Sequence, residues 1–385
     1  MIDHRFVSAI CDTYGLGLAM SRLEPVKGGL MHAMYRIRTT NGSYAVKILD
    51  QSVTRTRDVR AEYRRSEAVA ALFAAGGVPA VVALSGRQGR LTDIGVKTAL
   101  VYPWIDGEML PQDSAGPLAG RLMGSIIGAM HSTEVPQETF NKPAPFTSGF
   151  GEWKQLIDQA TAVDAAWVAD VVDMVPDLMN WELEACDATE RLGSAFVVSH
   201  RDLDQKNVLW PRRDSPAIVD WEGVGLVRPA LEVMSAALDW SGQKVGKPDA
   251  ATFKALLAGY RERRQVTVDE CRLALKVLLG ATGWLRANMR ASIDSDRAPE
   301  RRAQRAREIG GYARSLQSLA AHIDLWSTWC EEPKPIVKNP IRQQRAVNGA
   351  AVIEAASAVP EASAPLVRRP KERPRIDLDL DTPAR

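Results

Sequence analysis

The feature that most restricts the fold is a polar loop between short apolar runs in residues 196–221, which read FVVSHRDLDQKNVLWPRRDSPAIVDW. Apolar runs of this length beside turn residues are typical of buried strands. Two such strands flank the loop, and the last apolar run ends on Asp220. We therefore expect Asp202, Asn207 and Asp220 to meet at one edge of a sheet.

These three side chains suit phosphoryl transfer. Magnesium prefers oxygen ligands, and a carboxylate can face the hydroxyl of an acceptor. An H-R-D-x-x-x-x-N sequence followed by an aspartate at the end of a strand is the catalytic-loop and metal-loop pattern of kinases. Chance spacing in a structural loop is the alternative, and the strand-loop-strand context argues against it.

The same residues resemble the aminoglycoside phosphotransferase and choline kinase-like family, whose usual form is a His-Gly-Asp loop, a downstream asparagine and a hydrophobic run ending in Asp-Trp. The likeness extends from about residue 27 to about residue 240. It implies an α+β, two-lobed protein-kinase-like fold, with a small antiparallel-sheet N-lobe and a larger, mainly helical C-lobe. It also implies ATP and Mg²⁺ as cofactors.

By this resemblance Asp202 is the catalytic base or the carboxylate that orients the acceptor. Asn207 and Asp220 would hold magnesium, and His200 would brace the loop through hydrogen bonds. Arg201 stands in the catalytic loop where glycine is customary, so the loop is also similar to that of protein kinases. The absence of Asp-Phe-Gly and Ala-Pro-Glu argues against a protein kinase.

Two carboxylates are candidates for contact with the substrate. Asp204 stands where the family usually has histidine, and we expect it to face the acceptor. Glu222 follows Asp220-Trp221 and is grouped with Asp204, although it could instead assist the metal site or have a structural role. Gln205 and Lys206 replace the usual Pro-Gly.

A β-hairpin is expected near the N-terminus. Apolar and charged side chains alternate at residues 35–38, the turn signal Asn41-Gly42 follows, and a second strand covers residues 43–49. Lys47 is the only charged residue on this apolar strand. A buried ammonium is costly unless an anion meets it, so we expect ATP phosphates and one carboxylate beside Lys47.

A helix is expected over residues 58–75, before the stop signal Gly76-Gly77. At about 100° per residue, Glu62 falls on the apolar stripe and Glu67 nearly opposite. Glu62 is therefore the expected partner of Lys47, with Glu67 as the fallback. A purely structural ion pair is the alternative interpretation. Residues 81–84 and 98–102 are also expected to be strands.

The resemblance assigns the remaining nucleotide contacts. Gly28 and Gly29 occupy the place of the loop that covers the nucleotide, although a glycine pair alone is often only a turn. Lys47 takes the place of the phosphate-binding lysine. The backbone of the hinge Tyr102-Pro103-Trp104-Ile105 would receive the adenine.

Composition limits the possible partners. Lysine and arginine number 49 against 47 aspartates and glutamates, so the net charge of +2 gives no bulk attraction to nucleic acid or an acidic membrane. No apolar stretch approaches the ~20 residues that a membrane span needs. The four scattered cysteines, Cys11, Cys186, Cys271 and Cys330, argue against a disulfide framework and favour a reducing cytoplasm.

We expect an N-terminal nucleotide-binding lobe and hinge at residues 1–105, a catalytic and acceptor-binding lobe at 106–330, and a disordered tail at 331–385, whose protein partner, if any, the sequence does not define. The acceptor is expected to be a small molecule, an antibiotic such as an aminoglycoside or an amino-sugar. Choline, homoserine or a sugar is the alternative acceptor, and a catalytically silent nucleotide-binding module is the alternative class. A cationic acceptor would favour acidic residues of the second lobe, with Glu182, Glu184, Asp187 and Asp204 as candidates.

Overall fold

The computed structural model describes residues 4–26, 32–51, 54, 56–113, 115–144, 146–149 and 151–331. The expected tail therefore lies outside the described residues, apart from Glu331, as do Gly28 and Gly29. Within the described ranges, no helix is long and apolar enough to cross a membrane.

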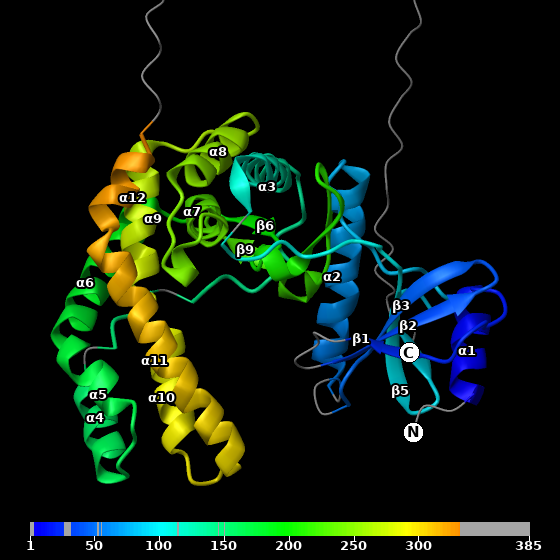
Figure 1. The fold of residues 1–385 in the computed structure, drawn as a ribbon, viewed down its shortest axis with the longest axis horizontal. Coiled ribbons are helices and arrows are strands. Elements are labelled where there is room, and N and C mark those ends of the chain that lie inside the picture. Colours follow the sequence, from blue (N-terminus) through cyan, green and yellow to red (C-terminus); the bar gives the residue numbers. More distant parts are fainter. Residues whose placement is uncertain are drawn as a thin grey trace, which may run out of the picture. The chain divides into compact units, whose positions relative to one another are not determined.

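The N-terminal part is built on a five-stranded antiparallel sheet (Figure 1). Its strand order is β1-β2-β3-β5-β4. The strands are β1 (Glu24–Val26), β2 (Ala33–Thr39), β3 (Gly42–Ile48), β4 (Thr92–Ile94) and β5 (Lys97–Pro103). The expected hairpin is confirmed, because β2 pairs with β3 from Thr39–Gly42 to Ala33–Ile48. This register sets Lys47 opposite Met34 on one side and Leu100 on the other.

Two helices accompany this sheet. Helix α1 (His4–Tyr14), which the sequence pattern did not indicate to us, packs Ile10 against Ile37 and Val46 of the sheet. Helix α2 (Arg57–Ala75) confirms the helix expected at 58–75, and the Thr56 hydroxyl accepts a hydrogen bond from the Val59 amide at its start. The strand expected at 81–84 does not form: this segment makes single backbone hydrogen bonds, one of them from the Leu84 amide to the Val101 carbonyl.

The rest of the described chain is mainly helical (Figure 1). Its helices are α3 (Gly116–His131), α4 (Glu152–Ala162), α5 (Val168–Val171), α6 (Val175–Leu192), α7 (Pro229–Trp240), α8 (Ala250–Arg261), α9 (Val268–Gly280), α10 (Gly283–Ile293), α11 (Pro299–Ala321) and α12 (Ile323–Trp329). Four short strands form two ladders: β6 (Val197–Ser199) with β9 (Gly225–Val227), and β7 (Val208–Arg212) with β8 (Ser215–Ile218). These ladders carry the polar loop of residues 200–207.

One large apolar cluster supports the ladders. Trp153, Trp221, Trp240, Phe253 and Tyr260 are among its fully buried members. Glycines allow α3 and α8 to approach closely: a Cβ on Gly124 or Gly259 would overlap the carbonyl oxygen of the facing helix. The helices therefore form a tightly packed base beneath the loop.

Candidate active site

Lys47, on β3 of the N-terminal sheet, contacts two carboxylates that follow β8. Its Nζ lies 2.7 Å from Asp220 Oδ1 and 2.8 Å from Glu222 Oε2, and its side chain is 11% exposed. Burial by itself would lower the pKa of Lys47, but the two carboxylates outweigh it and raise the pKa. Lys47 is therefore a charged ammonium held between two acidic side chains.

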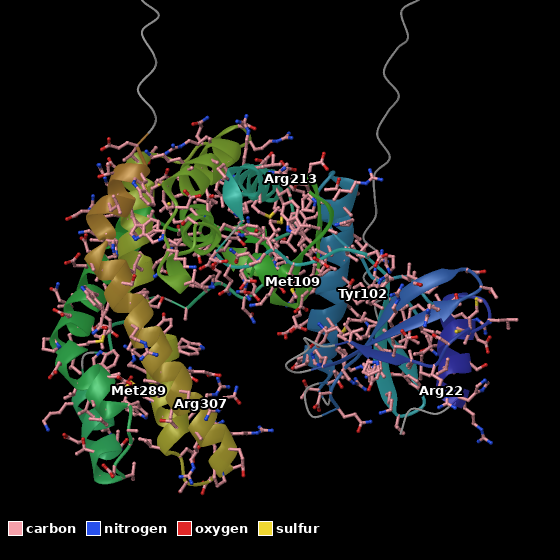
Figure 2. All side chains as sticks on the ribbon, in the orientation of Figure 1. Arg22, Tyr102, Met109, Arg213, Met289 and Arg307 are labelled. Carbon is pink, nitrogen blue, oxygen red and sulfur yellow. The ribbon has the colours of Figure 1, made fainter. Side chains whose placement is uncertain are left out.

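The expected ion pair of Lys47 with Glu62 does not form. Glu62 is exposed, because α2 buries the face that carries Tyr63, Ser66, Glu67 and Phe73. The fallback residue, Glu67, is buried but accepts hydrogen bonds from the Tyr102 hydroxyl at 2.6 Å and from the Ala83 amide at 2.9 Å. Tyr102 is labelled in Figure 2. Burial is the main cause that raises the pKa of Glu67.

His32 and Tyr63 support Glu222, and sequence reasoning missed both. The Asp50 amide donates to His32 Nδ1 at 3.1 Å, so Nε2 carries the proton and donates to the Tyr63 hydroxyl at 2.6 Å. Tyr63 in turn donates to Glu222 Oε2 at 3.4 Å. Burial lowers the pKa of His32, which agrees with a neutral ring. The position of Tyr63 one turn before Glu67, on the buried face of α2, was the available signal.

The catalytic loop is fixed by two of its own residues. His200 is buried; its Nε2 donates to the Val219 carbonyl at 3.0 Å, and its Nδ1 accepts from the Asp202 amide at 3.3 Å. Burial lowers the pKa of His200, so this neutral tautomer is favoured. Arg201 has φ of 65° and its guanidinium donates to the Gly223 carbonyl at 2.6 Å. This left-handed residue turns the loop so that Asp202 points away from the core.

Asp202 and Asn207 lie in direct contact. The Asn207 Nδ2 donates to the Asp202 carbonyl at 2.7 Å and to Asp202 Oδ2 at 3.0 Å, which leaves the amide oxygen of Asn207 for another partner. Lys206 Nζ lies 3.1 Å from Asp202 and 3.2 Å from Asp204 Oδ2. Sequence reasoning noted Lys206 only as a departure from the family pattern, although its place directly before Asn207 was the signal.

The β7–β8 ladder brings Asn207 and Asp220 to neighbouring positions. Val208 pairs with Ile218, and the Val219 amide donates to the Asn207 carbonyl at 3.0 Å. Asp220, the next residue, has φ of 62°, a conformation that is uncommon outside glycine and often occurs at functional sites. Asn207, Asp220 and Glu222 carry side-chain oxygens, the kind of donor that magnesium prefers.

Asp204 caps the short helix of residues 205–207 and accepts from the Lys206 amide at 3.1 Å. Its carboxylate continues a row of alternating charges, since Lys244 Nζ lies 3.9 Å from Asp204 Oδ2 and 3.0 Å from Asp239 Oδ2. The row runs Asp202, Lys206, Asp204, Lys244, Asp239. Glu222 lies on the Lys47 side of the site, so its grouping with Asp204 as an acceptor contact is not supported by its neighbours.

The expected hinge is only partly free to bind adenine. Tyr102 belongs to β5 and pairs with Ala45, and the Trp104 amide donates to the Ser43 carbonyl at 3.1 Å. Within the described ranges, the backbone groups of Ile105 have no hydrogen-bond partner. The Arg36 guanidinium lies over the Trp104 ring, 4.4 Å from its centroid. Ile105 is thus the hinge residue with an open backbone.

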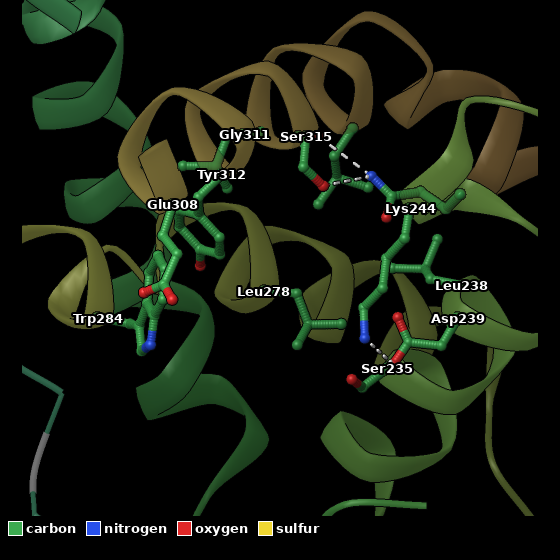
Figure 3. Close-up of a pocket in the computed structure, with 13 residues that line it drawn as sticks. Ser235, Leu238, Asp239, Lys244, Leu278, Trp284, Glu308, Gly311, Tyr312 and Ser315 are labelled. Atoms are coloured by element: carbon green, nitrogen blue, oxygen red, sulfur yellow. Dashed lines mark hydrogen bonds and ion pairs between the residues drawn. The ribbon is translucent and has the colours of Figure 1, made fainter. Parts of the chain in front are cut away.

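One cavity adjoins the catalytic loop, and a second cavity adjoins the first. One, of about 310 Å³, is lined by residues 201–204 of the loop and by parts of α7. The other, of about 390 Å³, extends to α10 and α11 (Figure 3). Glu182, a sequence candidate for contact with a cationic acceptor, lines neither cavity: it is fully buried and paired with Arg286.

This arrangement is typical of kinases. It combines a lysine on an N-terminal sheet, an H-R-D loop with a downstream asparagine, and an aspartate after β8. The phosphotransferase enzyme family (APH) matches residues 22–266. The chain therefore belongs to this family and is a small-molecule kinase, and ATP is the phosphoryl donor of the family. No curated protein sequence gives a significant match.

Three solved structures share the fold. A spectinomycin phosphotransferase in complex with ADP and spectinomycin has a TM-score of 0.63 and 12% identity, covering 82% of this chain and 97% of its own. An aminoglycoside phosphotransferase from Alicyclobacillus acidocaldarius has a TM-score of 0.56 and 14% identity, covering 81% and 94%. A choline kinase from Streptococcus pneumoniae has a TM-score of 0.52 and 16% identity, covering 82% and 99%. These likenesses confirm the two-lobed protein-kinase-like fold.

Proposed function

We propose that the protein transfers the γ-phosphate of ATP, with magnesium, to a hydroxyl of an aminoglycoside-type antibiotic or another amino-sugar. One observation carries the proposal. Asp202 and Asn207 are hydrogen-bonded on one loop, and the β7–β8 ladder sets Asp220, with Lys47 on its carboxylate, beside Asn207. A cation that could bind phosphate and oxygens that could hold a metal are thereby near the Asp202 carboxylate, which Asn207 and Lys206 contact.

On the nucleotide side, Lys47 would bind the phosphates of ATP and the backbone of Ile105 would bind the adenine. Asn207, Asp220 and Glu222 would hold magnesium, which when bound neutralises phosphate charge. Lys47 already lies on the carboxylates of Asp220 and Glu222, so it needs little movement to contact a nucleotide placed there. The His32–Tyr63 hydrogen bonds would hold Glu222 in position.

On the acceptor side, Asp202 would accept a hydrogen bond from the reacting hydroxyl and orient its oxygen toward the γ-phosphorus. The new bond joins that oxygen to phosphorus, the bond from phosphorus to the ADP oxygen breaks, and the hydroxyl proton passes to Asp202. Because the transition state is loose, positioning and charge neutralisation supply most of the acceleration. Lys206, in contact with Asp202, would meet the transferring phosphoryl group.

The preference for an amine-bearing acceptor is supported by the charge of the adjoining cavity. Its lining holds four carboxylates, of Asp202, Asp204, Glu232 and Asp239, against two cations, Arg201 and Lys244. We place the reaction in the cytoplasm, following the scattered cysteine pattern of the sequence.

ADP release from magnesium-ATP tests the proposal, with aminoglycosides, macrolides, choline, homoserine and sugars as acceptors. We expect turnover with an amino-sugar compound and a strong loss in the Asp202→Asn variant, at nearly unchanged ATP affinity. Turnover confined to choline or homoserine would move the protein to small-metabolite kinases. Near-normal turnover in Asp202→Asn would contradict the assigned role of Asp202.

A further inference from the structure

The cavity beside the catalytic loop and the second cavity meet at shared walls. Ser235, Asp239, Lys244 and Leu278 line both of them. The first cavity, of about 310 Å³, begins at Asp202, and the second, of about 390 Å³, leads away from it toward α11. Each is the size of a site for one small organic molecule. A ligand with its reacting hydroxyl at Asp202 could therefore extend past Lys244 into the second cavity.

The far wall of the second cavity lies beyond the part of the chain that the family match covers, residues 22–266. It is made of α10 and α11, where the rings of Trp284 and Tyr312 are in tilted contact with centroids 4.9 Å apart (Figure 3). Trp284 is 44% exposed, although most large aromatic side chains bury their rings. The exposed ring offers an apolar surface to a ring of a ligand.

Lys244 stands between the two cavities. Its Nζ lies 3.0 Å from Asp239 Oδ2, and the Asp239 side chain is only 16% exposed (Figure 3). Lys244 belongs to a short helix between Gly242, with φ of 84°, and Gly246, with φ of 67°. Glycine adopts this left-handed conformation without strain, and Gln243 of the same segment donates hydrogen bonds to Ser315, so the side chain of Lys244 is the part that can move. A half-exposed lysine on such a segment can leave Asp239 for water at small cost.

We propose that in the free enzyme the Lys244 ammonium occupies the place on Asp239 that an amine of the acceptor takes when it binds. The acceptor is a multi-ring, hydroxylated amine that displaces Lys244 from Asp239 and places a second ring against Trp284. This inference rests on the proposed function, because the first cavity is assigned to the acceptor through Asp202. Beyond that function, the inference specifies a second subsite for the acceptor, the group that occupies this subsite in the free enzyme, and the size of the acceptor.

The exchange keeps Asp239 paired throughout. An ammonium of the ligand takes the place of the Lys244 ammonium, so no buried carboxylate is left without a cation. A neutral ligand that displaced Lys244 would leave Asp239 unpaired, and this penalty discriminates against neutral acceptors. A small cation such as choline would fill one cavity only and would gain nothing from Trp284.

Binding without nucleotide tests the inference, measured by calorimetry on the full chain. The probes are spectinomycin, a fused-ring aminocyclitol with two secondary amines, and the pair glucosamine and glucose, which differ in charge. Lys244→Met should bind spectinomycin and glucosamine about two- to fivefold more tightly than the unaltered protein and leave glucose unchanged. Asp239→Asn should weaken both amines about tenfold or more. Trp284→Ala should weaken spectinomycin about fivefold and glucosamine little.

Lys276→Met is the matched control, because Lys276 has a similar exposure, 46%, and an ion pair with Glu184 away from both cavities. It should change no affinity, and thermal unfolding should show that each variant is folded. Weaker amine binding in Lys244→Met, equal changes for glucosamine and glucose, or no binding of either amine to any variant would overturn the inference. Lys244-dependent amine binding without phosphate transfer would instead refute the proposed function and leave this subsite standing.

Discussion

Lys206 Nζ lies 3.1 Å from Asp202 Oδ1, so a cation sits directly beside the carboxylate that we assign to the acceptor hydroxyl. The same ammonium is 3.2 Å from Asp204. Its side chain is more than half exposed, which leaves it free to move from these carboxylates to a phosphate. Preorganised charge of this kind acts where negative charge develops in the transition state.

Replacing Lys206 should therefore affect turnover more than ATP binding. We expect Lys206→Ala to lower kcat by about 10²-fold or more, with a small change in the KM for ATP. Lys206→Arg should retain most of the activity. A merely structural lysine would not alter binding of the ADP–aluminium fluoride complex, which mimics the transferring group, whereas we expect Lys206→Ala to weaken it. Unchanged affinity for that complex would contradict the assignment.

Glu222 shares Lys47 with Asp220, and the two carboxylates should differ in function. Glu222→Gln keeps the size of the side chain and weakens its hold on Lys47, so we expect a KM for ATP about fivefold higher, with measurable kcat. Asp220→Asn should remove most turnover. Tyr63→Phe should act in the same direction as Glu222→Gln but more weakly, because it leaves the Glu222 carboxylate on Lys47 and removes only the hydrogen bonds of the Tyr63 hydroxyl, to Glu222 at 3.4 Å and to His32 at 2.6 Å. A magnesium titration of each variant separates metal binding from the Lys47 effect.

Local patterns predicted the hairpin and helix α2 because each depends on nearby residues. The Asn41-Gly42 turn and the alternation before it specify the β2–β3 pairing, and Thr56 to Ala75 carries its own start and stop. The catalytic loop was predictable for another reason. Its polar residues interrupt strands whose apolar character is strong, so a loop at this place follows from the pattern. The expected single sheet edge does not form, because the loop joins two separate two-stranded ladders, β6–β9 and β7–β8.

Other features depend on contacts that no local pattern records. The buried face of α2 is turned away from Glu62 because Glu67 meets Tyr102 and the Ala83 amide, both from outside the helix. The apolar and charged residues of α2 are so intermixed that helical periodicity did not identify its buried face correctly. Lys47 finds its carboxylates at Asp220 and Glu222, more than 170 residues later in the chain. Such partners are set by tertiary packing alone.

Glu232 should make stability depend on pH. Burial alone would raise the pKa of this carboxyl, but hydrogen bonds from His131 and the Arg201 amide outweigh burial and hold the pKa below its usual value. A lowered folded pKa stabilises the fold above the unfolded pKa of about 4.3, and this contribution is lost as pH falls through the folded pKa.

Glu232→Gln should accordingly lower the free energy of unfolding by about 2 kcal/mol at pH 7. The difference between variant and unaltered protein should shrink on acidification below about pH 4.3. Urea denaturation at several pH values measures both effects. Glu262→Gln, at an exposed position, is the control and should show no such convergence. A difference that grew toward low pH would contradict the sign of the pKa shift.

The close approach of α3 and α8 should be as important for the loop as for the core. A Cβ at Gly124 would overlap the Leu256 carbonyl oxygen, which is backbone and cannot turn aside. We expect Gly124→Ala to lower the free energy of unfolding by about 3 kcal/mol or more. Gly283→Ala is the control, because a Cβ there meets nothing within 4 Å, and it should be neutral or slightly stabilising.

The Gly124→Ala change should also lower activity, because it separates α3 from α8. His131 ends α3, and its ring is hydrogen-bonded to the Tyr260 hydroxyl on α8 at 2.9 Å and to Glu232 at 2.6 Å. Glu232 in turn accepts from the Arg201 amide at 2.7 Å. Separating α3 from α8 therefore shifts the support of the catalytic loop, and Gly124→Ala should lower kcat even at temperatures where the variant is fully folded. Kinetics well below its Tm test this, and an unchanged kcat would show that the loop keeps its position without the α3–α8 contact.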